Sequence, residues 1–209
     1  MDPDIEAHIH RIQGKLNRLR ELDPGLTAFG ASSHEYRFYP PLPESEVVHV
    51  ENRLGVKLPS DYRRFLTRVG GGGAGPYYGI FPPDVEDPED ITSVDQTRKP
   101  FRWNEGFNPM EWENPCAQED VLCDEEDEGP PFPVLLVPGA LYICNYGCAI
   151  RFFLVVNGNS YGEVWIDRQA DEQGLEPVCG SFLEWYENWL NRELSNRSAS
   201  ARKDNGGDA

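Results

Sequence analysis

The sequence has few basic residues and no long apolar run. Lysine and arginine number 19 against 36 aspartates and glutamates, which leaves a net charge of −17. A field of that sign repels nucleic-acid phosphates and anionic lipid headgroups, so we expect neither as a partner, and a basic protein is favoured. No stretch approaches the roughly 20 apolar residues of a membrane helix, and the start, MDPDIEAHIH, lacks the basic and apolar parts of a signal peptide. We therefore expect a cytoplasmic protein that does not bind membranes.

The sequence also lacks a CxxC pair, and its number of cysteines is odd. This combination favours reduced thiols over a disulfide framework. Cys144 and Cys148 flank a short predicted turn, so their side chains could approach each other across two strands. A zinc site that adds Cys116 and Cys123 is an alternative, but their spacing of seven is unlike the short spacing of structural zinc ligands. The fifth cysteine is Cys179. We expect no metal and no cofactor.

A recognisable catalytic motif is missing as well. The four histidines lie outside any HExxH motif and away from any GxSxG motif. The many carboxylates look exposed, whereas a catalytic acid needs an apolar setting that raises its pKa. We therefore predict that the chain has no catalytic residues and is not an enzyme.

The first 30 residues predict one amphipathic helix. Its apolar residues recur at spacings of four and three, and Asp23-Pro24-Gly25 ends it. The apolar stripe consists of Ile5, Ile9, Ile12, Leu16 and Leu19. Packing onto the chain's own domain is favoured over a coiled-coil dimer seam, because two heptads are short for a stable coil. We expect a monomer, with a dimer through this helix as the alternative.

Two further helices precede a run of glycines. Val47, Val50 and Leu54 share one face of a helix that Gly55 ends, and a second helix follows Pro59 and ends at Gly70. The glycines of RVGGGGAGPYYGIFP follow a helix C-terminus, where the dipole repels anions, and no lysine follows them. We therefore interpret them as a turn into a strand near Gly79-Ile80-Phe81.

Residues 82–128 carry 16 acidic against three basic residues, a net charge of −13. The segment is either a solvated, partly disordered loop or a docking surface for a basic partner. In the second hypothesis the acidic residues attract the partner and aromatic residues anchor it. The predicted partner-binding residues are Trp112, Glu113, Glu119, Asp120, Asp124, Glu125, Glu126, Asp127, Tyr77 and Tyr78.

The last third predicts an antiparallel sheet and a helix. Four short runs rich in β-branched and aromatic residues are separated by turns: 134–137, 141–144, 148–156 and 163–166. Ser181 and Glu184 form a capping box at the start of a helix whose wide apolar face should pack onto the sheet. From Ser195 onward no apolar pattern remains, which predicts a disordered tail. The fold class is therefore α+β, a single domain with helices packed on an antiparallel-rich sheet.

Residues 39–194 resemble the SUKH superfamily, which includes bacterial immunity proteins and a fungal regulator of cell-wall synthesis. The resemblance lies in the following blocks: Glu51-x-x-Leu54-Gly55, Leu58-Pro59-x-Asp61-Tyr62-x-x-Phe65-Leu66, the glycine run with Gly75-Pro76 and Tyr78-Gly79, and Ser181-Phe182-Leu183-Glu184-Trp185. It implies an α+β protein-binding fold without catalytic residues.

The resemblance also implies a function and a domain organisation. We expect an immunity protein that neutralises a toxin domain of basic character, a nuclease or a deaminase. The alternative is a regulatory adaptor of a pathway such as cell-wall synthesis. The expected organisation is a helical extension at 1–30, a SUKH-like domain at 31–194 with an acidic loop at 82–132, and the tail at 195–209.

Overall fold

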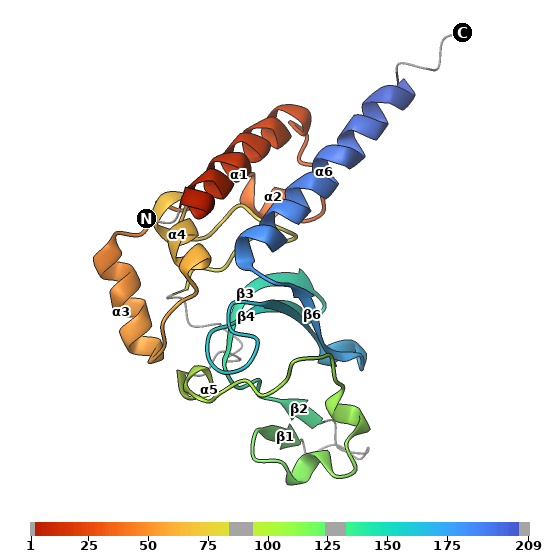
Figure 1. Ribbon diagram of the computed structural model, residues 1–209. Helices are drawn as coiled ribbons and strands as arrows, with labels where there is room; N and C mark the ends of the chain where they lie inside the picture. The colour runs from red at the N-terminus through yellow and green to blue at the C-terminus, as the bar shows by residue number, and fades with distance from the viewer. Residues whose placement is uncertain (1–2, 84–93, 124–132, 205–209) are drawn as a thin grey trace.

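The computed structural model describes residues 3–83, 94–123 and 133–204, with the backbone alone for 200–204 (Figure 1). The helices are α1 (Pro3–Leu22), α2 (Ala31–His34), α3 (Glu44–Leu54), α4 (Ser60–Arg68), α5 (Val94–Arg98) and α6 (Phe182–Asp204), with 3-10 turns η1 (Pro109–Glu111), η2 (Pro115–Ala117) and η3 (Gln169–Asp171). The strands are β1 (Val121–Cys123), β2 (Pro133–Leu135), β3 (Ala140–Gly147), β4 (Ile150–Val155), β5 (Val164–Arg168) and β6 (Gly174–Cys179).

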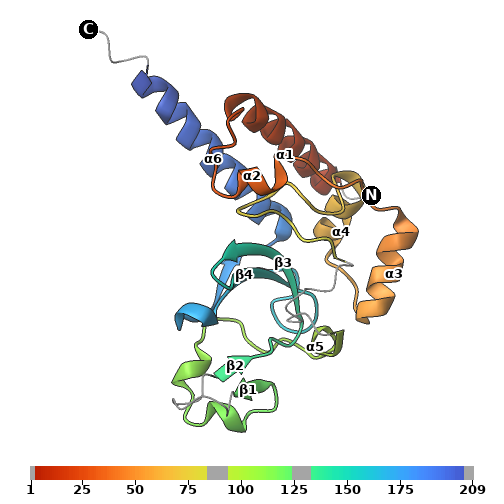
Figure 2. The ribbon, with the colours of Figure 1, turned by 180° about the vertical axis from the view of Figure 1, so that it is seen from behind.

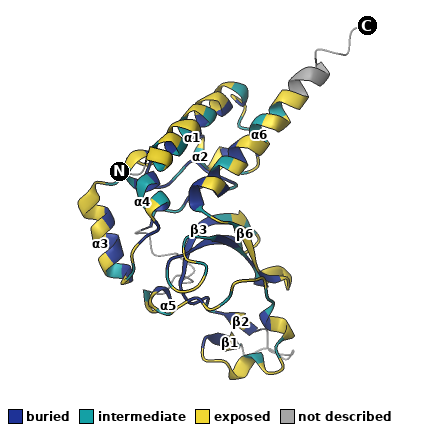
Figure 3. Cartoon of the chain, in the orientation of Figure 1, coloured by how far each residue is buried: buried dark blue, intermediate teal, exposed yellow. Residues whose placement is uncertain are grey.

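The centre of the fold is an antiparallel meander of four strands in the order β3-β4-β5-β6. Side chains alternate between the two faces of a strand, and in β4 both sets are apolar and buried. Phe152 and Leu154 belong to the hydrophobic cluster on one face, and Phe153 and Val155 to the cluster on the other. The predicted α+β class is confirmed, and the sheet is covered on both faces (Figure 3).

Helices α1, α4 and α6 cover the first face. The stripe predicted for α1 is buried at Ile9, Ile12, Leu16 and Leu19. Figures 1 and 2 show α1 and α6 lying side by side on the same side of the sheet, and the two helices are in contact. The chain therefore covers its own stripe, in the way that the sequence favours over a dimer seam.

Helix α6 continues beyond Ser195, the residue from which the sequence predicts a disordered tail. Residues 195–204 are helical, so the prediction of a disordered tail is wrong for them, while 205–209 lie outside the described residues. Arg197 explains part of the difference, because its guanidinium pairs with Asp23 at 2.8 Å and with Glu193 at 3.1 Å. Charged contacts of this kind leave no apolar pattern in the sequence. The C-terminal end of α6 projects away from the domain (Figure 1).

The acidic segment covers the second face of the sheet. Sequence analysis treats 82–132 as a loop, but its described part, 94–123, forms α5, η1, η2 and β1. Phe101 and Val121 are buried there against Trp165 and Leu175 of the sheet. Most of the acidic residues described in 94–123 are exposed to solvent, while a few apolar residues hold this part of the segment in place.

Two strands were not predicted. Strand β6 contains Pro177, which disfavours a strand within a sheet, but β6 is an edge strand and tolerates it. Strand β1 is only three residues long and pairs with β2 in a separate antiparallel ribbon. Conversely, the strand expected near Ile80 is reduced to isolated bridges with Gly73 and Cys144.

The glycine run allows close backbone packing, as the sequence suggests. Gly73 has φ of 98°, and a Cβ there would lie 2.5 Å from the carbonyl oxygen of Arg37. Gly79 has φ of 99°, and its Cβ would lie 2.4 Å from the carbonyl oxygen of Gly73. Both positions combine a left-handed backbone with a close approach that only glycine fits.

A buried carboxylate joins α3 to α4. Glu51 is 2% exposed, and its Oε1 accepts hydrogen bonds from the backbone N–H of Leu58 and from Arg63. Its other oxygen accepts from Lys57 at 2.8 Å. Burial by itself raises the pKa of Glu51, but the hydrogen bonds and the two cations outweigh it and lower the pKa. This carboxylate therefore fixes the corner between the two helices.

We expect Glu51→Gln to lower the free energy of unfolding at neutral pH by about 2 kcal/mol, because a buried charge pair and a strong acceptor are lost. A lowered pKa stabilises the fold above the unfolded-state pKa, and this contribution disappears as the pH falls through the folded-state pKa. Urea unfolding as a function of pH should therefore show the two proteins converging in acid. The control is Glu46→Gln, an exposed position on the same helix. Equal effects of both substitutions, or a constant difference at all pH values, would contradict the prediction.

Candidate protein-binding surfaces

The structure separates the predicted partner-binding residues into two groups. Trp112, Glu113, Glu119 and Asp120 lie in the segment that leads into the β1–β2 ribbon, at the end of the molecule away from α1 and α6 (Figure 1). Tyr77 and Tyr78 lie in the glycine-rich loop and pack against residues of the helical side. The acidic run Asp124, Glu125, Glu126 and Asp127 lies outside the described residues. The ten residues therefore do not form one surface.

Trp112 belongs to an aromatic stack. The rings of Phe107 and Trp112 are nearly parallel, with centroids 5.9 Å apart, and Phe107 stacks on Trp103 at 4.2 Å. All three rings are partly buried against the second hydrophobic cluster. Trp112 therefore presents part of its ring to solvent while the remainder holds the acidic segment on the sheet.

Asp120 has an internal role. Its side chain is buried and pairs with Lys99 and with Arg102, the latter at 3.2 Å. The hydrogen bond from Lys99 raises the pKa of that lysine. The backbone carbonyl of Asp120 also accepts from the N–H of Leu136 at 2.7 Å. Asp120 thus joins α5 to the ribbon and has no exposed carboxylate to offer a partner.

The outer surface of this segment combines acidic and apolar side chains. Leu122 and Val134 are register partners on β1 and β2 and are 57% and 40% exposed. Turn η1 contacts β2, and Met110 of η1 is also exposed. Exposed carboxylates come from the same turns: Glu111, Glu113 and Glu119. We call these six residues the ribbon surface. Apolar groups with a charged rim are typical of protein interfaces.

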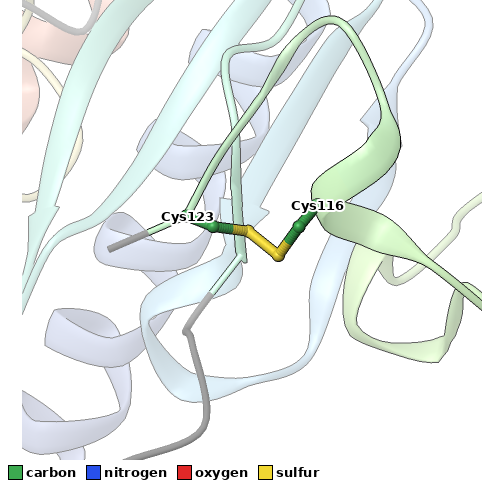
Figure 4. Close-up of a disulfide and its surroundings, with 2 residues drawn as sticks. All are labelled: Cys116 and Cys123. Atoms are coloured by element: carbon green, nitrogen blue, oxygen red, sulfur yellow. A yellow bond between two sulfur atoms is a disulfide. The ribbon is translucent and has the colours of Figure 1, made fainter. Parts of the chain in front are cut away.

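A disulfide between Cys116 and Cys123 ties η2 to β1 (Figure 4). The prediction of five reduced thiols is wrong at this pair. The 3-10 turn Pro115–Ala117 reverses the chain, so the two Cα atoms come within 5.8 Å. An odd number of cysteines excludes complete pairing, but it does not exclude one bond and three free thiols. The bond also removes both sulfurs from the zinc alternative.

The side chain of Gln169 pairs with the backbone of β2, as a neighbouring strand would. The amide of Gln169 donates to the carbonyl of Leu135 at 3.2 Å and accepts from its N–H at 2.7 Å. Gln169 is held in turn by the buried Asp167, which also accepts from Tyr142 at 2.6 Å. Burial raises the pKa of Asp167. This network anchors the ribbon to β5, and no spacing in the sequence indicates it.

The second group of predicted residues belongs to a cluster of exposed aromatic rings. Phe29 is 57% exposed and contacts Tyr78 at 5.4 Å and Tyr146 at 5.9 Å between centroids. Tyr77 lies below them and contacts Phe29 and Tyr146. We call Phe29, Tyr77, Tyr78 and Tyr146 the aromatic surface. Sequence reasoning missed Phe29 and Tyr146, although an aromatic residue in the Asn-Tyr-Gly turn of a hairpin is a usable signal.

Cys144, His34 and His8 have structural partners. Cys144 is buried, its thiol donates to the carbonyl of Pro76 at 3.2 Å, and burial raises its pKa, whereas Cys148 is exposed. The structure does not pair these two cysteines. His34 accepts a hydrogen bond from the N–H of Tyr36, and burial lowers its pKa. His8 lies 2.8 Å from Glu187.

Two searches of the described residues gave negative results. Within residues 3–83, 94–123 and 133–204, no three His, Cys, Asp or Glu side chains gather as a metal site requires. Over the same part of the chain, no helix is long and apolar enough to cross a membrane.

Comparison with known proteins identifies one family. The model of the SMI1 / KNR4 family (SUKH-1) matches residues 41–188, which is more than half of the chain. No curated protein and no solved structure shows a significant match. The matched range begins before α3 and ends within α6; it includes the sheet, α4 and the acidic segment but not α1.

We expect three of the five cysteines to be alkylated when the oxidised protein is denatured without reductant, and all five after reduction; intact mass measures both numbers. Because the bond closes a loop of about eight residues, Cys116→Ser/Cys123→Ser should lower the free energy of unfolding by about 2.5 kcal/mol. The control is Cys148→Ser, an exposed free thiol. Alkylation of all five cysteines before reduction would contradict the pairing.

Proposed function

Because the chain belongs to the SMI1 / KNR4 family (SUKH-1), we propose that it is a non-enzymatic protein-binding module, and specifically an immunity protein that neutralises a basic toxin domain. The family supports protein interaction in general. The basic character of the partner is inferred from this chain's own charge. Toxins that act on nucleic acid are commonly basic because they bind phosphates, so a nuclease or a deaminase fits this partner.

One observation carries the proposal: residues 82–128 hold most of the net charge, and the part of them described as 94–123 is folded onto the sheet and presents apolar groups to solvent. Residues 82–128 contribute −13 of the total of −17. Their described part bears the ribbon surface, with exposed Leu122 beside Val134 and a rim of glutamates. The acidic run 124–128 connects the two strands of the ribbon in sequence.

The two kinds of group have different tasks in the proposed complex. Carboxylates accelerate the encounter with a basic partner and orient it, because their field extends over about a Debye length, roughly 8 Å at physiological salt. Apolar side chains hold the complex once water has been expelled. Leu122, Val134 and the exposed part of Trp112 are the proposed anchors, while Glu113 and Glu119 form the rim. Asp120 supports the surface from inside.

The proposed state is a monomer, because α6 and α4 cover the stripe of α1 that could have formed a dimer. The proposed location is the cytoplasm. Disulfides such as Cys116–Cys123 are more common in proteins of oxidising compartments than in cytosolic proteins. Cell fractionation combined with the alkylation assay addresses both points.

The function is tested by capturing partners with the tagged protein from its own cells at low and high salt, and identifying them by mass spectrometry. A basic toxin retained at low salt, whose activity the purified protein then inhibits stoichiometrically, is the expected result. Repeated recovery of one neutral housekeeping protein would instead favour the regulatory adaptor.

Once the toxin has been identified, we expect replacement of residues 124–128 by serine and asparagine to slow its association with the protein about tenfold. The same replacement should flatten the salt dependence of the association rate. Leu122→Ser should mainly increase the dissociation rate, because it removes an anchor and no charge. Surface plasmon resonance at several salt concentrations separates the two rates. Glu46→Gln, on α3, is the matched control for loss of an exposed carboxylate. An unchanged association rate and salt slope in the 124–128 variant would refute the role of the acidic run.

A further inference from the structure

The aromatic surface is built from three segments that are far apart in the sequence. Phe29 lies in the loop between α1 and α2, Tyr77 and Tyr78 in the glycine-rich loop, and Tyr146 near the end of β3. Phe29, Tyr78 and Tyr146 are 57%, 44% and 38% exposed. Rings of this size are normally buried, and contiguous exposed apolar groups mark interaction sites.

The backbone below these rings is closely packed. Gly30 has φ of 78°, and a Cβ there would lie 2.0 Å from the carbonyl oxygen of Tyr77, so the two loops are in direct contact. Tyr77 itself has φ of 53°, an unfavourable value for a residue with a bulky side chain. Such conformations persist where the surrounding structure enforces them, and they are common at functional sites.

Two further contacts hold Tyr77 and the loop before Phe29. The ring of Tyr77 stacks on Phe152 of the sheet, with centroids 5.3 Å apart and planes within 6°. The loop before Phe29 is held by Asp23, whose carboxylate accepts from the N–H groups of Thr27 and Ala28 at 2.9 and 3.1 Å. A partner would therefore meet aromatic side chains that are already ordered, which reduces the entropy lost on binding.

The chemistry of the occupant follows from charge. The guanidinium of Arg192 lies over the face of Tyr77, 5.7 Å from the ring centroid, so one ring of the cluster already holds a cation of this chain. The faces of the neighbouring rings carry the same partial negative charge. The chain carries −17, of which residues 82–128 hold −13, so the net charge attracts a cationic partner to the molecule as a whole, and the ring faces select the contact at this surface.

We propose that the aromatic surface is a second binding site, at which the exposed faces of Phe29, Tyr78 and Tyr146 stack with arginine side chains of the basic partner. This inference rests on the proposed function, since it takes the partner to be basic. Arginine is favoured over lysine because its planar guanidinium stacks on rings and is more weakly hydrated.

The site is separate from the ribbon surface. Phe29 lies two residues before α2, on the helical side of the sheet, whereas β1 and β2 lie at the opposite end in both views (Figures 1 and 2). The ribbon surface attracts any cation through its carboxylates. The aromatic surface distinguishes between cations of equal charge, and this difference provides the test.

The experiment compares octa-arginine with octa-lysine, two peptides of equal length and side-chain charge, by calorimetric titration of the full-length protein at 0.15 M salt. We expect octa-arginine to bind more tightly by roughly three- to tenfold, as a few exposed cation–π contacts allow. In Phe29→Ser/Tyr78→Ser/Tyr146→Ser this preference should disappear while binding of octa-lysine is retained. Tyr161→Ser is the matched control. Tyr161 is also an exposed tyrosine, at 48%, but it is not part of the aromatic surface, and its hydroxyl donates to the carbonyl of Lys57.

A second measurement does not depend on the triple variant being folded. In wild-type protein labelled for NMR, octa-arginine should shift the aromatic resonances of Phe29, Tyr78 and Tyr146. Equal preference for arginine in the wild type and a folded triple variant, or shifts confined to residues 94–137, would overturn this inference and leave the proposed function intact. If neither peptide bound at this salt concentration, the basic partner and the aromatic site would both be refuted.

Discussion

A four-stranded sheet that is apolar on both faces is the constraint on which the rest of this structure depends. Because β4 alternates Phe152 and Leu154 with Phe153 and Val155, neither face tolerates water. Helices α1, α4 and α6 cover one face, and the acidic segment covers the other. Residues 94–123 of the acidic segment are therefore obliged to fold, since a disordered loop there would leave Trp165 and Leu175 exposed.

Sequence patterns predicted the elements whose stability is local. The four-three spacing in α1, the residues Val47, Val50 and Leu54 in α3, and the short β-rich runs indicate helices and strands directly. The second cover of the sheet could not be predicted, because its anchors, Phe101 and Val121, lie in a segment rich in charged residues that shows no apolar period. Their partners lie far away in the sequence, and no period connects them.

Prediction of the candidate sites was limited in the same way, by contacts between residues that are far apart in the sequence. Net charge predicts a basic partner, which stays a prediction, and three aromatic residues chosen from the sequence, Tyr77, Tyr78 and Trp112, lie at the candidate surfaces. Contact with Phe29 and Tyr146 depends on how three loops meet, and the burial of Asp120 depends on Lys99 and Arg102. Counting cysteines missed the disulfide because a 3-10 turn, which leaves little trace in composition, brings the two sulfurs together.

The disulfide closes a small ring at the point where the acidic segment enters the β1–β2 ribbon, and the inner residues Asp120 and Val121 hold that ring to the rest of the fold. Outer residues such as Glu113 and Leu122 contribute little to this attachment. Mutations can therefore accumulate on the outside of the ribbon without affecting the sheet below. A gene under selection to keep binding a partner whose surface changes could diversify this surface rapidly while the scaffold stays constant.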